Sequence, residues 1–427
     1  MRGMRGHEFL GWRARRATAA VMLGLIAVAI ATASTTASGN AAAVPAKGCG
    51  SLPTGPIQAP ASLLSSLPAS VRSSYSGLPF PIQASAFSHW KPPHGRPWTI
   101  GVDVLSTANA TQAQQLQDDS VLASQLEKTG VISNLVTDID ETNSVPEQIQ
   151  QLQAMIEQKV SLIIVSPADP IALLPTVQAA YAADIPVISS GSVINSPDVI
   201  NVDNSAYEFG GLPAAYMAKY ELGGKGNVIL EEGIPTNGNA QAQLAGATAA
   251  FAQCPGIHIL TTLVGDFSSP VAKSAMLEYL TTNPGVPIAG VWDGGVQSLG
   301  ELSAFLQLGK NPPAITNIGA VLGTIAYWNK HKNTFKSAAM LLGETDLHRI
   351  IMDVAVRMLE GKGPIANAII VKGVLYADKN LSKIVRYNAI AVNINNPQDA
   401  QQPPFTLLSD KALDAFFSKP GVKPSSL

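Results

Sequence analysis

Apolar and polar residues follow one another in blocks from residue 98 onward, and the blocks have two different periods. Short runs such as WTIGVDV (98–104) and SLIIVSP (161–167) are apolar on both faces of a strand. Longer segments lie between such runs, and in 144–159 the apolar residues recur at helical spacing from Ile149 to Ile156. Strands that are buried on both faces and separated by helices form a parallel sheet covered by helices. The pattern predicts an α/β fold.

The alternation then occurs a second time. Strands are predicted at 227–233, 257–265, 286–294 and 313–319, with helical segments between them. A chain of 427 residues is too long for one ordinary core and divides most simply into domains of about 150 residues each. We therefore expect two Rossmann-like lobes, each with a parallel sheet.

Polar residues follow the predicted strands, at the edge where ligands bind in open parallel sheets. Most of them carry amides or hydroxyls without net charge, and two aromatic residues stand among them. Such a crevice suits a small neutral polyol such as a sugar, although the same residue types are also common in turns and helix caps. The candidate ligand-binding residues are Ser106, Asn109, Thr111, Ser166, Ser190, Gly191, Asn204, Asn239, Gln241, Phe267, Trp292 and Asp293.

Recognisable catalytic and metal-binding motifs do not occur. GGKGNV (223–228) lacks the spacing of a phosphate-binding loop, and SSGS (189–192) is not a nucleophile elbow. TDIDETN (137–143) collects acidic residues but lacks the glycine and the distal glutamate of a calcium loop. We expect neither an enzyme, nor a metal site, nor a cofactor.

The first 43 residues have the composition of an export signal. Arginines precede the apolar run AVMLGLIAVAIATA, and small residues follow it. Outside 1–43, no stretch is long and apolar enough to span a membrane. Without 1–43, which contain five of the basic residues and Glu8, the 28 Lys and Arg and 30 Asp and Glu become 23 and 29. We expect an exported protein, periplasmic or extracellular, and the negative charge makes nucleic acid an unsuitable partner.

The sequence contains two cysteines, Cys49 and Cys254. In an exported protein they are candidates for a disulfide. Lipidation of Cys49, which would tether the protein to the cell envelope, and two unpaired thiols are the alternatives. Residues 44–97, between the signal and the first strand, are rich in Pro, Ser and Gly. Their aromatic residues indicate an arm that packs against the body of the protein.

Residues 98 to about 365 resemble the type I periplasmic binding proteins of sugar ABC importers, the ribose- and galactose-binding group. The motifs that carry the resemblance are WTIGVDV, DIDETNSVPEQIQQLQAMI, IIVSPADPIALLPTVQAAYAADIPVISSGS, VDNSAYEFGGLPAAYMAKY, NAQAQLAG and VWDGGVQSLGEL. The resemblance implies two lobes that are joined by three crossing segments and close on a ligand like a hinge. It places lobe 1 at 98–204 and 343–370, and lobe 2 at 205–342 and 371–427 with a C-terminal extension.

The family pattern is altered at several pocket positions. Asn109 is kept after the first strand, but the aromatic residues that often follow it are absent. Ser190 and Gly191 fall in the region of an Asp-Arg pair, and Gln241 replaces a family arginine. These changes remove charge-assisted hydrogen bonds. The sugar specificity of the known members therefore does not transfer to this chain.

The resemblance implies a receptor that hands a small neutral solute to an ABC permease. We expect a monomer, because helices cover both faces of each predicted sheet. A receptor for a membrane signalling protein and a binder of a non-sugar molecule are the alternatives on the same fold. The effector domain of a transcription repressor would need a DNA-binding segment where the export signal stands.

Overall fold

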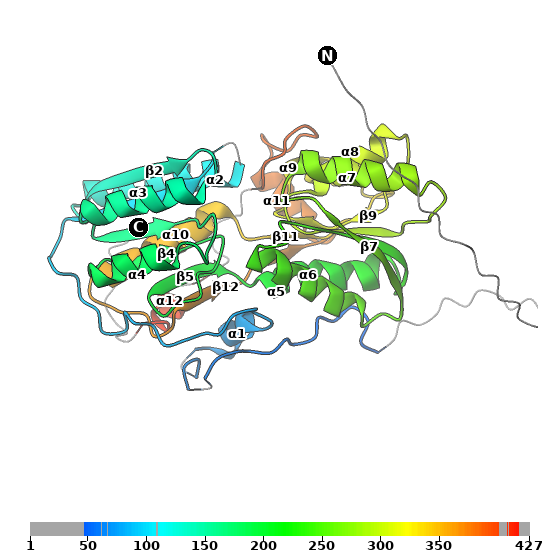
Figure 1. The fold of residues 1–427 in the computed structure, drawn as a ribbon. Helices are drawn as coiled ribbons and strands as arrows, with labels where there is room; N and C mark the ends of the chain where they lie inside the picture. Colours follow the sequence, from blue (N-terminus) through cyan, green and yellow to red (C-terminus); the bar gives the residue numbers. More distant parts are fainter. Residues whose placement is uncertain are drawn as a thin grey trace, which may run out of the picture. The chain divides into compact units, whose positions relative to one another are not determined.

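The computed structural model describes residues 47–417 except 61, 66, 108–109, 401–407 and 409. The expected export signal and the candidate residue Asn109 lie outside the described residues. All described residues belong to one compact unit (Figure 1). In this part of the chain, no helix combines the length and the apolar character that crossing a membrane requires.

Lobe 1 contains a parallel sheet of six described strands in the order β12-β5-β4-β3-β1-β2. Central strands are buried on both faces, as the apolar runs predict: all four residues of β3 are at most 1% exposed. The strands are β1 (Trp98–Leu105), β2 (Ile132–Asp140), β3 (Leu162–Val165), β4 (Val187–Ser189), β5 (Val199–Asn204) and β12 (Ala368–Val371).

Two pairs of helices cover this sheet: α2 packs on α10, and α3 on α4 (Figure 1). Sequence signals fix where some of them begin. Ser144 caps α3 with its side chain, and Pro146 stands in the first turn. Asp169 accepts the N–H groups of the turn that leads to α4. The helices are α2 (Ala110–Lys128), α3 (Val145–Glu157), α4 (Leu174–Ala182) and α10 (Glu344–Leu359).

Lobe 2 contains two smaller sheets among the described residues. The strands β7-β6-β8-β9 are parallel, and in the order β10-β11-β13 the last strand runs antiparallel. The strands are β6 (Lys225–Glu232), β7 (Gly256–Val264), β8 (Gly290–Asp293), β9 (Ala314–Ile315), β10 (Asn317–Ile318), β11 (Ala339–Leu341) and β13 (Val374–Tyr376). The helices are α5 (Ala206–Tyr216), which continues as the π-helix η2 (Met217–Glu221), α6 (Gly238–Phe251), α7 (Ser269–Thr282), α8 (Ser298–Gln307), α9 (Leu322–His331) and α11 (Leu381–Tyr387).

Apart from the N-terminal arm and the C-terminal residues, which also contact both lobes, three segments of the described chain cross between the cores of the two lobes. These crossing segments connect β5 to α5, β11 to α10, and β12 to β13. The fold is thus the two-lobed α/β architecture that the sequence predicts. The parallel strands of both lobes end near the crossing segments, which places the loops after the strands around the space between the sheets (Figure 1).

The last described residues correct one predicted boundary. The sequence assigned 371–427 to lobe 2, and β13 and α11 do pack there. Helix α12 (Asp410–Asp414) instead contacts lobe 1, where Arg357 Nε donates to Asp414 Oδ1 at 3.1 Å. Leu413 and Phe416 are buried on that lobe, and the Phe416 carbonyl accepts the Ile365 N–H. The chain returns because these apolar side chains are covered on lobe 1.

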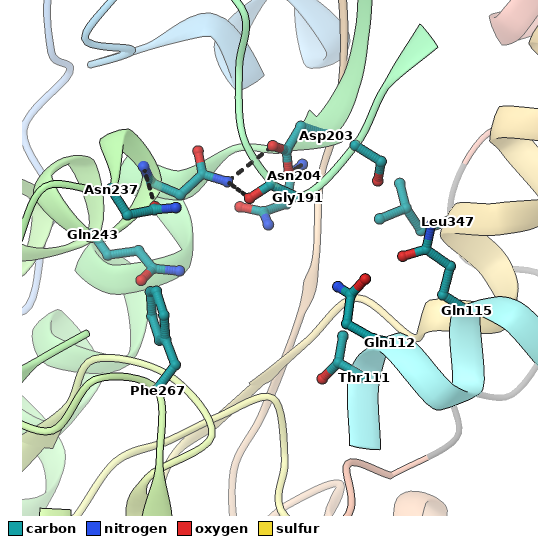
Figure 2. A pocket seen from close by; sticks show the side chains of 12 residues that line it. Thr111, Gln112, Gln115, Gly191, Asp203, Asn204, Asn237, Gln243, Phe267 and Leu347 are labelled. Carbon is teal, nitrogen blue, oxygen red and sulfur yellow. Dashed lines mark hydrogen bonds between the residues drawn. The ribbon is translucent and has the colours of Figure 1, made fainter. Parts of the chain in front are cut away.

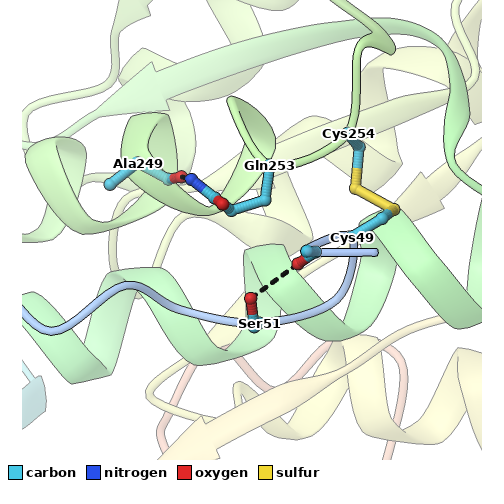
Figure 3. The surroundings of a disulfide bond; sticks show 6 residues. Cys49, Ser51, Ala249, Gln253 and Cys254 are labelled. Carbon is cyan, nitrogen blue, oxygen red and sulfur yellow. Dashed lines mark hydrogen bonds between the residues drawn. A yellow bond between two sulfur atoms is a disulfide. The ribbon is translucent and has the colours of Figure 1, made fainter. Parts of the chain in front are cut away.

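The Pro- and Ser-rich segment is an ordered arm that packs against the body, as its aromatic residues indicate. It contains α1 (Ala69–Arg72) and the 3₁₀ helix η1 (Ser73–Tyr75), and the side chains of Tyr75 and Phe87 are fully buried. Near its beginning, Cys49 forms a disulfide with Cys254, three residues after the end of α6 (Figure 3). The sequence left open a disulfide, lipidation of Cys49 or two unpaired thiols, and the structure contains the disulfide.

Candidate functional site

A cavity of about 160 Å³ lies between residues of the two lobes (Figure 2). Lobe 1 contributes the start of α2, the ends of β4 and β5, and one residue of α10. Lobe 2 contributes the start of α6 and the loop after β7. The lining residues are Thr111, Gln112, Gln115, Ser190, Gly191, Asp203, Asn204, Asn237, Asn239, Gln243, Phe267 and Leu347.

Half of the lining residues are among the candidates from the sequence. They share a position at or just after the end of a strand, or in the first turn of the following helix. They are Thr111, Ser190, Gly191, Asn204, Asn239 and Phe267.

Two of the remaining candidates, Trp292 and Asp293, are engaged elsewhere. Trp292 is fully buried and donates its indole N–H to the Gly210 carbonyl at 2.9 Å, so it joins β8 to α5. Asp293 accepts the N–H groups of Gly295, Gln297 and Ile318 and organises the loop after β8. Neither residue lines the cavity. Their place at the end of a strand indicated the correct edge of the sheet but not the direction of the side chain.

Ser106, Ser166 and Gln241 also lie outside the lining. Ser106 donates its N–H to Asn143, and Gln241 donates its amide to the exposed Pro235 carbonyl. Ser166 is directly behind the site: its hydroxyl donates to Gln115 Oε1 at 2.9 Å. Ser166 therefore holds a lining residue and does not itself line the cavity.

The sequence missed the other lining residues, some of which carried a usable signal. Gln243 is one helical turn after Asn239, and Gln115 is one turn after Thr111, so both share a helix face with a candidate. Leu347 on α10 gave no local signal, because the second crossing of the chain, from β11 to α10, brings it to the site. Gln112, Asp203 and Asn237 are immediate neighbours or near neighbours of predicted residues.

Asn239 connects the two lobes across the cavity. Its side-chain Nδ2 donates to Asp203 Oδ2 at 2.9 Å and to the Gly191 carbonyl at 3.2 Å (Figure 2). The position of Asn239 is set by Asn237, whose side chain accepts the Asn239 and Ala240 N–H groups and caps α6. Both side-chain hydrogens of Asn239 are thus used on lobe 1.

Asp203 is the acidic residue among the described lining residues, which include no Lys, Arg or His. Burial raises the pKa of Asp203 to about 6, and the hydrogen bonds from Asn239 and from the Asn204 N–H act in the opposite direction. Because its acceptor oxygens are already bonded within the protein, the cavity presents mainly neutral amides and hydroxyls to a ligand.

Phe267 supplies the aromatic surface of the cavity. Residues 266 and 267 both have left-handed backbone conformations, with φ of 54° and 52°, and Gln297 Oε1 accepts the Phe267 N–H at 2.8 Å. The ring packs on the backbone of Gly233, where a Cβ atom would lie 2.2 Å from a ring carbon. A glycine is therefore required at position 233 if the ring is to keep its place.

Three amides of the lining contain a buried atom that finds no hydrogen-bond partner in the described part of the chain. These atoms are Gln115 Nε2, Asn204 Oδ1 and Gln243 Oε1. An unpaired buried amide atom costs about 1–3 kcal/mol. A molecule with hydroxyl groups, which both donate and accept, can satisfy such amides. Across the described residues no group of His, Cys, Asp and Glu is arranged to hold a metal ion.

Two α/β lobes around a small polar cavity define a solute-binding protein. The family model of the periplasmic binding protein domain matches residues 103–363, so this chain belongs to that family. The match confirms the resemblance found in the sequence. The family consists of extracytoplasmic binding proteins and not of enzymes.

Two relatives are similar to this chain. A xylitol-binding protein of Mycolicibacterium smegmatis is 26% identical over 226 residues, which are 52% of this chain and 62% of the relative. A D-ribose/D-allose-binding protein of Pseudomonas aeruginosa is 27% identical over 191 residues, 42% of this chain and 57% of the relative. The aligned segments thus span less than two thirds of both relatives.

A solved ABC transporter solute-binding protein from Thermobispora bispora has the same fold. The superposition has a TM-score of 0.61 at 23% identity and covers 72% of this chain and 92% of that protein. The arm before residue 98 lies outside the segment that the family model matches.

Proposed function

We propose that this chain is an extracytoplasmic receptor that binds a small neutral sugar or polyol between its lobes and delivers it to an ABC permease. The observation that carries the proposal is the chemistry of the cavity. Its described lining offers amides, hydroxyls and one phenyl ring, and the acid present there is bonded to Asn239.

The size of the cavity supports a small ligand. Its volume of about 160 Å³ is below the range of drug-sized pockets. A single sugar or a short polyol suits this volume better than an oligosaccharide does. The two relatives are named for binding xylitol and for binding D-ribose and D-allose, which agrees with this class of ligand.

Capture and release require the two lobes to move about the crossing segments, as in hinge closure around a ligand. Delivery to a permease is inferred from membership of the family. We expect the receptor to act as a monomer, because helices already cover the faces of the lobe 1 sheet.

Calorimetric titration of the exported chain, residues 44–427, with xylitol, D-ribose, D-allose and myo-inositol tests the proposal. Gln243→Ala, which changes a lining residue, is compared with Gln241→Ala on the same helix but outside the lining. We expect binding of at least one of these compounds, weakened about 5- to 10-fold by Gln243→Ala and unchanged by Gln241→Ala. Binding of charged or aromatic solutes alone would refute the ligand class, and equal effects of the two variants would refute the site.

A further inference from the structure

The N-terminal arm is attached to both lobes. On lobe 2, the disulfide holds Cys49 to α6, and the Tyr207 hydroxyl of α5 donates to the Pro53 carbonyl at 3.1 Å. On lobe 1, the buried Tyr75 hydroxyl donates to the Ala368 carbonyl of β12 at 2.8 Å. Residues 49–75 of the arm are therefore attached to lobe 2 by a disulfide and a hydrogen bond, and to lobe 1 by a hydrogen bond.

Further along, the arm continues the edge of lobe 1. Gln83 exchanges hydrogen bonds with Asn367, donating its N–H to the side chain and accepting the Asn367 N–H. Ala84 forms an antiparallel bridge with Ala366, and the Ser85 N–H donates to the Ile365 carbonyl. These contacts fix the second half of the arm to the segment that leads into β12.

The two halves of the arm are bonded to each other where the lobes meet. The Gly55 N–H donates to Ser76 Oγ at 2.8 Å, and the Gly77 N–H donates to the Pro56 carbonyl at 3.0 Å. Gly77 has a φ of 69°, and a Cβ atom there would lie 2.3 Å from the ring of Tyr207. The arm therefore sits directly on the first turn of α5.

The crossing segment between β12 and β13 is also in contact with the arm. Lys372, between β12 and β13, donates to Ser73 Oγ of the arm at 2.7 Å and to Glu208 Oε1 of α5 at 3.1 Å. Glu208 lies in the first turn of α5, just after the crossing from β5, and Lys372 is the first residue after β12. A rotation of one lobe relative to the other changes the distance between these groups.

We propose that the arm is a brace that restricts the opening of the two lobes and so holds the Asn239–Asp203 contact together. When the lobes rotate apart, groups anchored on lobe 2 by Cys49 and Pro53 must separate from groups anchored on lobe 1 by Tyr75 and Gln83. Opening therefore breaks arm contacts in addition to those across the cavity. The proposal rests on the lobe motion included in the proposed function, and its test needs no ligand.

The test measures the distance between spin labels on the two lobes by pulsed electron resonance. Labels are placed through non-natural side chains at the exposed positions Lys128 on α2 and Glu278 on α7, so that both cysteines stay bonded. The oxidised protein is compared with the same protein after reduction, which acts on the Cys49–Cys254 bond alone because the chain has no other cysteine.

Gly77→Ala and Gly130→Ala form a matched pair of variants. Both glycines have a φ of 69°, but an added Cβ meets the Tyr207 ring at Gly77 and meets nothing within 4 Å at Gly130. The two variants share the backbone strain, and Gly77→Ala in addition forces the arm away from α5.

We expect the distribution of label distances to become wider and to shift to longer distances on reduction and in Gly77→Ala. The effect is expected to be largest in reduced Gly77→Ala, whereas Gly130→Ala resembles the wild type. The brace is refuted if the reduced Gly77→Ala protein keeps the wild-type distribution. It is also refuted if Gly130→Ala widens the distribution as much as Gly77→Ala does. If the distances widen as expected but calorimetry shows no binding of a sugar or polyol, the proposed ligand class is refuted and the brace is still supported.

Discussion

The side chain of Asn239, at the start of α6, donates to the carboxylate of Asp203, at the end of β5, with a separation of 2.9 Å. One residue belongs to lobe 2 and the other to lobe 1, and both line the cavity. A buried carboxylate needs hydrogen-bond donors to remain stable away from water. The ligand site and the contact between the lobes therefore depend on the same pair.

Replacing Asn239 by alanine removes this donor and leaves the buried carboxylate of Asp203 with fewer partners. We expect the free energy of unfolding at pH 7 to fall by about 1–3 kcal/mol, and the pKa of Asp203 to rise further. Urea denaturation measures the first effect. The control is Gln241→Ala, whose side chain bonds the exposed Pro235 carbonyl; an equal loss in both variants would contradict the role of Asn239.

The stability of the fold is expected to decrease as the pH rises from about 4 to about 8. Burial raises the pKa of Asp103 from 3.8 to about 8, in spite of the hydrogen bond from Gln148 at 2.6 Å. Within this interval the folded chain keeps a proton that the unfolded chain releases. Each such group therefore lowers the unfolding free energy by about 1.4 kcal/mol per pH unit.

Urea denaturation across this pH range, with Asp103→Asn as the variant, measures the contribution of Asp103. Asparagine cannot ionise, so we expect the variant to lose part of the slope. The remainder of the slope comes from the other buried acids with raised pKa values, among them Glu221 and Glu231 at about 8 and Asp203 at about 6. An identical slope in the wild type and in Asp103→Asn would show that Asp103 is not protonated in the folded protein.

Removal of the disulfide by the double change Cys49→Ser and Cys254→Ser is expected to cost about 2–5 kcal/mol. The bond joins residues 205 positions apart, so its loss increases the freedom of the unfolded chain considerably. Thermal unfolding of the wild type with and without reductant gives the same comparison without mutation. A melting temperature that does not change in either experiment would contradict a stabilising role for the bond.

Replacing Gly233 by alanine is expected to displace the Phe267 ring and to weaken binding of the polyol. A Cβ atom at position 233 would lie 2.2 Å from the ring, whereas one at Gly238 has nothing within 4 Å. We therefore expect weaker binding of xylitol in Gly233→Ala and unchanged binding in Gly238→Ala, measured by calorimetry. Equal affinities in the two variants would show that Phe267 does not contribute to the site.

The sequence predicted the elements of the matched family region well because their apolar periods are regular. The segment SPVAKSAMLEYLTT, for example, coincides with α7 (Ser269–Thr282). The C-terminal part was assigned less well. Leu413 and Phe416 return to lobe 1, and no local pattern shows which of two apolar surfaces such residues will cover.

Strand ends located the binding edge but not the side chains that face the cavity. Trp292 and Asp293 are the last residues of β8 and so lie at the binding edge, yet both serve the packing of lobe 2. Leu347 lines the cavity from a helix that reaches it only through the second crossing of the chain. Contacts that depend on how separate elements meet cannot be read from local spacing.

The Cys49–Cys254 bond also orders the events of biosynthesis. Cys254 follows every strand of the first lobe except β12, so the arm can be locked only after most of lobe 1 and the start of lobe 2 have been made. The cytoplasm keeps thiols reduced, whereas extracytoplasmic compartments oxidise them. A molecule still inside the cell therefore lacks the bond, and the state of these two sulfur atoms records whether a given copy has completed its passage across the membrane.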